Sequence, residues 1–335
     1  MKKSLLALAV LTAITGAASA QSSVTLYGKI DLGLVLDSGA AAGKSVRIDS
    51  GVTGGSRLGF KGVEDLGGGY KAAFQLETGF CAAGTATAPN FCTGGNNFMG
   101  RQAWGALSGP FGSISAGRQY SLGFNNLSTI DPFGTGFAGQ VNNIVDPSGI
   151  RLNNSATYNT PTFGGVTASA EIAFGEQVGN WQANRETGAG ITYASGPVYV
   201  GATYYGVDNS TGTTSTRKNY LVGGTYDLGV VKLHALVQKS TGVELDVLDL
   251  MGGVTVPIGG GNLMASYIHH NDRTLADKDA NQVGVGYLYP LSKRTSVYTA
   301  FARIKDDNGA TFTVGNATAA GTGDKAFNLG VVHNF

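Results

Sequence analysis

Three arginines, Arg57, Arg101 and Arg151, each stand at the start of a stretch with strand character. A guanidinium group stays protonated at physiological pH, so grouped arginines keep a permanent positive charge even when they lie close together. If these stretches are neighbouring tilted strands of a water-filled barrel, the three side chains reach one wall at similar depth. They would then act on passing ions as an electrostatic filter. Lys29 and Glu77 fall on the same predicted wall, and the alternative for each residue is an ordinary solvated charge.

The residues that could support catalysis or metal binding are poorly placed for either. His269 and His270 are adjacent, so in a strand they point to opposite faces and cannot share a metal ion. His234 and His333 are isolated, with no serine or aspartate at a spacing that suggests a hydrolase. Residues 39–45 (GAAAGKS) are one residue too short for a phosphate-binding loop, and no helix is expected after them. We therefore predict neither an enzyme nor a site for a metal or cofactor.

The first twenty residues have the organisation of a cleavable secretory signal. Lys2 and Lys3 precede an apolar core over 5–14, and Ala18-Ser19-Ala20 forms a cleavage site before Gln21. The apolar core is too short to cross a bilayer as a helix. We expect two parts, a signal peptide over 1–20 and a single domain over 21–335.

The composition favours a protein built of many alternating strands. Charged residues make up 13% of the chain, against about 25% in a typical soluble domain. No stretch after the signal approaches the ~18 consecutive apolar residues of a transmembrane helix. Once Lys2 and Lys3 leave with the signal, 21 basic residues remain against 22 acidic ones, which gives no support for a nucleic-acid partner.

Apolar residues alternate with polar ones in several runs, which is the pattern of a strand with two different faces. A soluble β-sandwich also alternates, so this pattern alone does not identify a membrane barrel, whose apolar face meets lipid and whose polar face meets water. The alternation is cleanest over 24–34, 70–80, 166–174 and 198–205.

The connections between these runs are of two kinds. Seven are short, and eight longer polar stretches lie between them. Fifteen connections imply sixteen strands, and short turns at one end with long loops at the other are typical of bacterial outer-membrane barrels, with the turns in the periplasm and the loops outside. The expected short turns are 64–69, 108–112, 161–165, 195–197, 227–229, 257–261 and 290–294, and the expected loops are 37–54, 81–97, 121–150, 175–186, 207–217, 240–245, 271–280 and 305–324.

The chain ends on an alternating run whose last residue, Phe335, lies on the mostly apolar face. Such an end suits the strand that closes a barrel in lipid, and we expect it to pair with the first strand at 24–34. Cys81 and Cys92 lie in one short loop of an exported chain, and we predict a disulfide between them because no histidine or acid cluster nearby suggests a metal or catalytic pair.

Several segments resemble the general diffusion porins, specifically the trimeric type of β-proteobacteria. They are SSVTLYGKIDLG (22–33), SRLGFKGVEDLGGGYKAAFQLETGF (56–80), RQAWGALSGPFGSISAGRQ (101–119), GIRLNNSATYNTPTFGG (149–165) and GVVHNF (330–335). Residues 175–280 resemble the family in pattern only.

The resemblance implies a homotrimer of sixteen-stranded transmembrane antiparallel β-barrels in the outer membrane of a Gram-negative bacterium, with the third loop folded into the lumen. It also implies an arginine ladder at Arg57, Arg101 and Arg151, opposed by acids of that loop. Lys29 matches a further basic site and Glu77 an acid beside the ladder. In the loop, Asp131 precedes the turn of Pro132, Phe133 and Gly134, but an acid that some relatives carry one place later is missing.

The favoured hypothesis is a porin that lets small hydrophilic solutes and inorganic ions diffuse through a water-filled pore, with a mild preference for anions. Expected partners are outer-membrane lipid and lipopolysaccharide, and the barrel-assembly machinery, for which Phe335 would be the signal. Alternatives are a substrate-specific porin and a barrel that serves mainly as an adhesin or receptor through its loops.

Overall fold

The computed structural model describes residues 23–84, 98–213 and 215–335. The predicted signal peptide and Cys92, and with it the predicted Cys81–Cys92 disulfide, lie outside the described residues.

Almost every regular element is a β-strand. In the described part of the chain, one α-helix, α2 (Leu122–Ile130), and one short 3₁₀ helix, η1 (Val141–Asn143), interrupt the series. The strands are β1 (Ser23–Ala40), β2 (Gly43–Ser50), β3 (Arg57–Gly67), β4 (Tyr70–Gly79), β5 (Gln102–Gly109), β6 (Gly112–Tyr120), β7 (Arg151–Asn159), β8 (Val166–Ala173), β9 (Glu186–Ser195), β10 (Val198–Asp208), β11 (Ser215–Asp227), β12 (Lys232–Gly242), β13 (Leu245–Ile258), β14 (Gly261–Asp272), β15 (Ala280–Pro290), β16 (Thr295–Asp306) and β17 (Lys325–Asn334).

The seventeen strands occupy sixteen positions around a closed antiparallel barrel, because β2 and β3 share one of them. β2 pairs with the second half of β1, from Leu32 to Ala40, and β3 pairs with the first half, from Ser23 to Lys29. Residues 51–56 separate these two pieces. The predicted all-β barrel of sixteen strands is confirmed.

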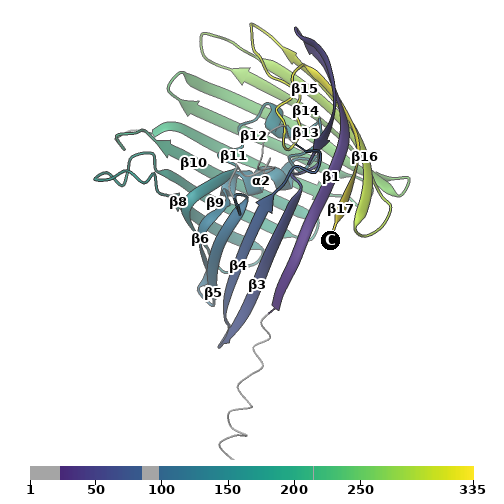
Figure 1. The fold of residues 1–335 in the computed structure, drawn as a ribbon. Coiled ribbons are helices and arrows are strands. Elements are labelled where there is room, and N and C mark those ends of the chain that lie inside the picture. The colour runs from purple at the N-terminus through teal and green to yellow at the C-terminus, as the bar shows by residue number, and fades with distance from the viewer. Residues whose placement is uncertain (1–22, 85–97, 214) are drawn as a thin grey trace, which may run out of the picture.

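The barrel closes where the last strand meets the first (Figure 1). The pairing runs from Lys29 opposite Asn334 to Ser38 opposite Lys325, so it begins further along the first strand than the predicted Val24. Beyond Asn334, Phe335 and Gly28 exchange two backbone hydrogen bonds of 2.9 and 3.0 Å.

All seven predicted short turns separate consecutive strands, but two of the predicted long loops are mostly strand. Residues 37–54 were expected as loop, yet β1 continues to Ala40 and β2 follows after two residues. The expected loop 240–245 is likewise a tight turn between β12 and β13. Both stretches are polar because one face of each strand meets the barrel interior. In the sequence, such a strand has the polarity of a loop.

Alternation along each strand separates an exposed apolar face from a buried face that carries polar groups. In β16, Phe301 is 42% exposed, whereas its neighbour Ala302 is fully buried. Gln238, Gln282 and Asn328 are also fully buried. Because the sheet is closed, the buried face is the inside of the barrel and the apolar face is the outside. Among the described residues, no helix has the length and hydropathy needed to cross a bilayer.

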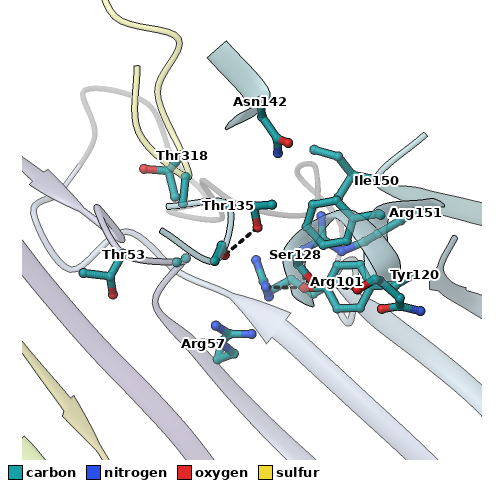
Figure 2. Close-up of a pocket in the computed structure, with 16 residues that line it drawn as sticks. Thr53, Arg57, Arg101, Tyr120, Ser128, Thr135, Asn142, Ile150, Arg151 and Thr318 are labelled. Atoms are coloured by element: carbon teal, nitrogen blue, oxygen red, sulfur yellow. Dashed lines mark hydrogen bonds between the residues drawn. The ribbon is translucent and has the colours of Figure 1, made fainter. Parts of the chain in front are cut away.

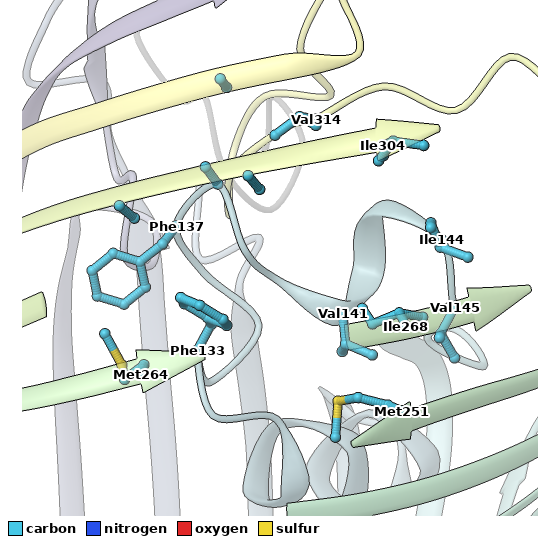
Figure 3. Packing of buried hydrophobic residues seen from close by; sticks show 14 of the residues in the cluster. Phe133, Phe137, Val141, Ile144, Val145, Met251, Met264, Ile268, Ile304 and Val314 are labelled. Carbon is cyan, nitrogen blue, oxygen red and sulfur yellow. The ribbon is translucent and has the colours of Figure 1, made fainter. Parts of the chain in front are cut away.

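Loop 121–150 packs against the buried face of the strands. Helix α2 contacts β9, β10, β11 and β12. Further along the loop, apolar side chains meet others from β13 to β16 and from the last long loop (Figure 3). The members labelled there are Phe133, Phe137, Val141, Ile144, Val145, Met251, Met264, Ile268, Ile304 and Val314. This packing holds the loop against strands β9 to β16 and against the last long loop.

Candidate functional site

A cavity of about 380 Å³ lies between loop 121–150 and the strands that carry the three arginines (Figure 2). Its walls come from four parts of the chain: residues 53–57, the strand ends around Arg101 and Arg151, loop 121–150, and the last long loop. The lining residues are Thr53, Gly54, Gly55, Arg57, Arg101, Tyr120, Phe124, Asn125, Ser128, Gly134, Thr135, Asn142, Ile150, Arg151, Ala317 and Thr318.

The structure brings Arg57, Arg101 and Arg151 together at this cavity. Arg57 is the first residue of β3, Arg101 directly precedes β5, and Arg151 is the first residue of β7. All three therefore stand at the long-loop end of their strands. Among the described residues that line the cavity, only these three arginines are charged, so the lining contains no acid.

Tyr120, the last residue of β6, links two of the arginines. Its hydroxyl oxygen accepts hydrogen bonds from Nη2 of Arg101 (2.7 Å) and from Nη2 of Arg151 (2.8 Å). The guanidinium carbon of Arg151 also lies 4.6 Å from the centre of the Tyr120 ring, at cation–π distance. The sequence analysis missed this residue, although an aromatic residue with a polar end directly before a long loop could have drawn attention to it.

Glu77 is buried beside the arginines, with its side chain 2% exposed. Its Oε1 accepts a hydrogen bond of 2.7 Å from Nε of Arg101. Its Oε2 accepts one of 3.0 Å from the Tyr27 hydroxyl and lies 3.8 Å from Nη1 of Arg57. One carboxylate thus faces two of the three guanidinium groups from behind the cavity wall.

Lys29 stands next to Arg57, since the two residues are paired directly across β1 and β3. Nζ of Lys29 and Nη2 of Arg57 both approach Gly54, where an added Cβ atom would lie 3.0 and 3.3 Å from them. Gly54 also has a φ of +151°, which favours glycine. A larger residue at this position would therefore push the two cations away from residues 51–56.

Asp131 ends helix α2 and directs its carboxylate into its own loop. Ser121 caps the start of the helix by accepting a hydrogen bond of 3.0 Å from the Phe124 amide. At the other end, the Asp131 oxygens accept from the amides of Phe133, Thr135 and Val141 at 3.1, 2.9 and 3.1 Å. Burial raises the pKa of Asp131 to about 6, although these three donors act in the opposite direction.

The turn that follows Asp131 is used mainly for packing. Phe133 lies against Gly284 and Gly286 of β15 and against Gly139. Pro132 lies against Gly253 of β13, and Gly134, with a φ of +58°, lines the cavity. Of the residues predicted for this turn, only Gly134 reaches the cavity, and neither Asp131 nor Lys29 is among the lining residues.

The break between β2 and β3 is held by a buried carboxylate that the sequence analysis did not single out. Asp31 is fully buried. Its Oδ2 accepts from the amide and the hydroxyl of Thr53 at 2.6 and 2.7 Å, and its Oδ1 accepts from the Tyr298 hydroxyl at 2.7 Å. Residues 51–56 are in turn bonded to loop 121–150, because the amide of Phe137 donates to the Val52 carbonyl at 2.8 Å.

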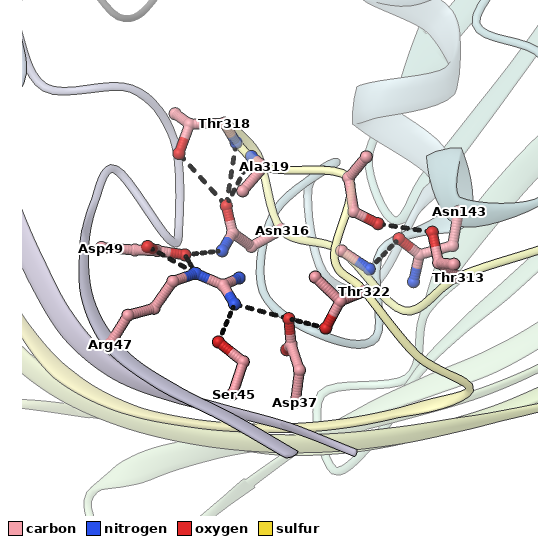
Figure 4. A network of polar contacts seen from close by, with 12 residues as sticks. Asp37, Ser45, Arg47, Asp49, Asn143, Thr313, Asn316, Thr318, Ala319 and Thr322 are labelled. Atoms are coloured by element: carbon pink, nitrogen blue, oxygen red, sulfur yellow. Dashed lines mark hydrogen bonds and ion pairs between the residues drawn. The ribbon is translucent and has the colours of Figure 1, made fainter. Parts of the chain in front are cut away.

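The last long loop, 307–324, completes the wall through a polar network (Figure 4). The hydroxyl of Thr318 donates to the Ser50 carbonyl at 2.8 Å, and Asn316 donates to Asp49 at 2.8 Å. Arg47 of β2 joins Asp49 to Asp37 of β1. The amide of Gly315 donates to Asn143 of η1 at 3.0 Å. The two long loops and the broken strand thus support one another around the cavity.

Comparisons with known proteins agree with this architecture. The family model described as Gram-negative porin matches residues 7–309. The chain is 35% identical to outer membrane porin protein 32 of Delftia acidovorans, with both chains covered completely. It is 31% identical to an outer-membrane porin of Bordetella pertussis, over 96% of this chain and 99% of the relative. Among solved structures, an anion-selective porin from Comamonas acidovorans is 30% identical and has a TM-score of 0.81, over 94% of this chain and all of the other.

The family match covers most of the chain, the two sequence relatives are aligned over almost their whole length, and the barrel is closed. The resemblance noted in the sequence is thereby confirmed, and the chain belongs to the Gram-negative porin family, whose members are diffusion channels of the outer membrane rather than enzymes.

Proposed function

We propose that the arginine-lined cavity is the constriction of a channel that prefers anions. The observation that carries this proposal is the charge of the lining: among the described residues, three arginines contribute charge and no acid does. The anion-selective porin from Comamonas acidovorans, which shares the fold at 30% identity, is consistent with it.

The proposed mechanism involves no chemical step. A hydrated anion that enters the narrow region meets a positive potential that is only partly screened, because the arginines lie close to its path and to low-dielectric walls. A cation meets the same potential as a barrier. Glu77 compensates part of the positive charge, but it is one acid against three arginines and Lys29. The preference is therefore moderate, and small hydrophilic solutes of either sign can pass.

We also propose that loop 121–150 lies across the channel and narrows it. Three of its contacts support this. His234 of β12 lies 2.6 Å from the carbonyl oxygen of Ile130, and Gln282 of β15 donates to the Gly139 carbonyl at 3.1 Å. On the opposite side of the loop, Gly136 is in close contact with Thr53. Contacts with strands on one side of the closed barrel and with residues 51–56 on the other support a loop that crosses the interior.

The same family assignment supports a proposal for the assembly. We propose a homotrimer in the outer membrane, with Phe335 as the signal that the barrel-assembly machinery reads and with lipopolysaccharide among the surrounding lipids. Light scattering of the detergent-solubilised protein, corrected for bound detergent, should give the mass of three chains. A monomeric mass under conditions that keep the barrel folded would contradict this assembly.

The selectivity proposal is tested by reversal potentials across planar bilayers in a salt gradient. We expect Arg57→Ala and Arg151→Ala each to shift the reversal potential toward that of a cation-preferring pore, because each removes a lining charge. Arg294→Ala is the matched control, since it removes the same charge from a short turn at the other end of the barrel.

Stepwise, ohmic channels with unchanged reversal potentials in both lining variants would refute anion selection by the arginines. Absence of any channel in the folded wild-type protein would remove the proposed function itself.

A further inference from the structure

Lys61 of β3 is a charged side chain on the inner wall, between the arginine cavity and the short-turn end of the barrel. It follows Arg57 by four residues along the same strand, so the two side chains share one face. Four residues span about 13 Å of strand, which at a tilt of about 40° places Lys61 about 10 Å further along the channel axis. Lys61 is exposed and is not among the residues that line the cavity.

The side chain of Lys61 is held on this wall by Tyr27 of β1. Its Nζ lies 5.4 Å from the centre of the Tyr27 ring, at cation–π distance. The ring is fixed in turn, because the Tyr27 hydroxyl donates to Glu77 at 3.0 Å and accepts from Nε2 of Gln75 at 2.7 Å. Since Glu77 also bonds to Arg101, Lys61 stands on the same wall as the arginines, further from the long loops.

The charge of Lys61 is not balanced by a neighbouring acid. Its cross-strand partners, Thr25 on β1 and Gln75 on β4, are uncharged. In the described part of the chain, none of the ion pairs includes Lys61. Closer to the short turn, Asp65 and Lys71 lie directly opposite each other on β3 and β4, so their charges offset one another. Lys61 therefore adds an uncompensated positive charge to the wall below the arginines.

We propose that Lys61 is a second anion site of the channel, separate from the arginine cavity and nearer to the short-turn mouth. This inference rests on the proposed function, because it places a second positive step on the same path. An ion held at a single site leaves slowly, whereas adjacent sites of the same sign let it pass from one to the next. Lys61 thus lowers the barrier for an anion that moves between the arginines and the short-turn mouth.

The position of Lys61 makes its contribution depend on the direction of a salt gradient. A charge is screened within about 3 Å in 1 M salt, but it acts over about 30 Å in 10 mM salt. Lys61 therefore attracts anions when the dilute solution is on the short-turn side, and it has little influence when the concentrated solution is there. The arginines lie in the proposed constriction, which every ion must pass, so they act in both directions.

The test is the reversal potential of single channels in planar bilayers, with about 10 mM salt on one side and about 1 M on the other. Each channel is measured with the gradient in both directions, so its orientation in the membrane need not be known. Lys61→Ala removes the charge, and Lys61→Arg keeps it. Lys44→Ala is the control, because Lys44 is an exposed lysine on the outer face of β2, which it shares with Val46 and Ile48.

In Lys61→Ala we expect the anion-to-cation permeability ratio to fall about twofold in one gradient direction and to change little in the other. A factor of about two is the effect of one unit charge about 10 Å from an ion in water. Lys61→Glu, which replaces a positive charge with a negative one, should lower the ratio about fourfold in the same direction. Lys61→Arg and Lys44→Ala should behave like wild type. If the alanine variant does not fold, Lys61→Gln, which is closer in shape to lysine, gives the same comparison.

Unchanged ratios in Lys61→Ala and Lys61→Glu overturn the second site and leave Lys61 an ordinary solvated lysine. An equal fall in both gradient directions also overturns it, because the charge would then act within the constriction. Arg57→Ala, measured alongside, separates this inference from the proposed function. If Arg57→Ala lowers the ratio and the Lys61 variants do not, only the second site fails. If wild type itself shows no anion preference, the proposed function fails and the second site fails with it.

Discussion

The three arginines carry the same charge in different surroundings, and this difference decides how each contributes to the field in the cavity. Arg101 has a side chain only 5% exposed and bonds directly to Glu77. Arg57 is 23% exposed and lies 3.8 Å from the same carboxylate. Arg151 has no carboxylate partner among the described residues and stacks on Tyr120. We infer that the Arg101 charge is largely balanced, and that Arg57 and Arg151 supply most of the uncompensated potential.

Neutralising Glu77 should therefore strengthen anion preference while weakening the barrel. Glu77→Gln removes the negative charge that faces Arg101 and Arg57, so the reversal potential in a salt gradient should move toward the anion limit. Removing one partner from a buried ion pair costs about 3 kcal/mol. The melting temperature of the folded form, read by gel mobility, should fall. Glu64→Gln, the same change on an exposed side chain, is the control and should alter neither quantity. Unchanged selectivity would show that Glu77 has no influence on the pore.

The buried carboxylate of Asp131 gives loop 121–150 a dependence on pH. Burial raises its pKa from 3.8 to about 6, so between these values the folded protein holds a proton that the unfolded chain has lost. The stability contributed by this group is therefore fully present below about pH 4 and is lost as the pH rises through 6. The loss corresponds to about 3 kcal/mol.

This dependence is checked by amide hydrogen exchange of Thr135 and Val141, corrected for the intrinsic effect of pH. Protection should decrease from pH 4 to pH 6 in the wild type and stay level in Asp131→Asn. Asp227→Asn, which alters an aspartate in an exposed turn, should keep the wild-type profile. A flat wild-type profile would mean that the three amide donors outweigh burial and keep Asp131 ionised throughout.

At the residue scale, the sequence could identify charges but not their partners. Arg57, Arg101 and Arg151 were predicted because the start of each strand is visible in the pattern, and the structure does bring them to one cavity. The Asp131 carboxylate, expected to face them, bonds to the amides of its own loop instead. The direction of the Asp131 side chain depends on the backbone turns of residues 131–141. These turns produce no periodic pattern of apolar residues in the sequence. Asp31 depends on contacts between residues distant in sequence, for which a single sequence carries no signal. For Tyr120 the only signal is a polar aromatic side chain directly before a long loop.

At the scale of elements, the break between β2 and β3 is the feature that shapes the cavity. A strand that continued through 51–56 would pair with β1 and present only side chains to the interior. Here the backbone turns inward instead, and Asp31 replaces the missing ladder bonds by accepting from Thr53. Tyr298, which reaches Asp31 from β16, is itself buried. The position of residues 51–56 therefore depends on a side chain that is about 240 residues away in sequence and three strands away in space.

Removing the Tyr298 hydroxyl should loosen residues 51–56. Tyr298→Phe keeps the ring but deletes a hydrogen bond to a buried carboxylate, which is worth about 1.5–3 kcal/mol. Exchange of the Thr53 and Phe137 amides should become about tenfold faster or more, because both amides are bonded within this segment. Tyr287→Phe removes a comparable bond to the Ile258 carbonyl at a short turn and should not affect either amide. Equal exchange in wild type and Tyr298→Phe would show that Thr53 alone holds the segment.

The elements themselves were predictable where turns contain glycine or proline and where one face is clearly apolar. All seven short turns meet this condition and were located correctly. The strand β2 was not predicted, because Lys44, Arg47 and Asp49 give it the charged composition of a loop. Arg47 and Asp49 lie on the interior face, where charge is accommodated by pairing with each other and with Asp37. A charged strand inside a barrel is therefore the element that pattern analysis detects least well.

At the scale of the whole molecule, Phe335 extends the seam that closes the barrel. Phe335 exchanges two backbone hydrogen bonds with Gly28, and its ring occupies the space where a side chain at position 28 would lie, with an added Cβ only 2.2 Å from Cζ. Glycine at position 28 and an aromatic residue at 335 therefore fit together. The seam between β1 and β17 ends at this contact.

Deleting Phe335 should impair closure more than replacing it with alanine, because deletion also removes the two backbone bonds. We expect a loss of about 1–2 kcal/mol for Phe335→Ala and about 1–3 kcal/mol more for the deletion. The measurement is the folded fraction after refolding in detergent, where no assembly machinery takes part. Phe163→Ala, an aromatic residue 70% exposed at the same end, is the control. Similar folded fractions for all variants would limit any role of Phe335 to recognition in the cell.

The division of the second strand position into β2 and β3 also has a consequence for how such channels can diversify. Within an uninterrupted strand, inserting or deleting a residue shifts the register of the pairs that follow in that strand, or forces a bulge. Residues 51–56 lie outside the ladder, with intact pairing on both sides of the gap. Changes in their length or type can therefore accumulate without disturbing the strands. This short segment gives the lineage a place where pore properties can evolve separately from the fold.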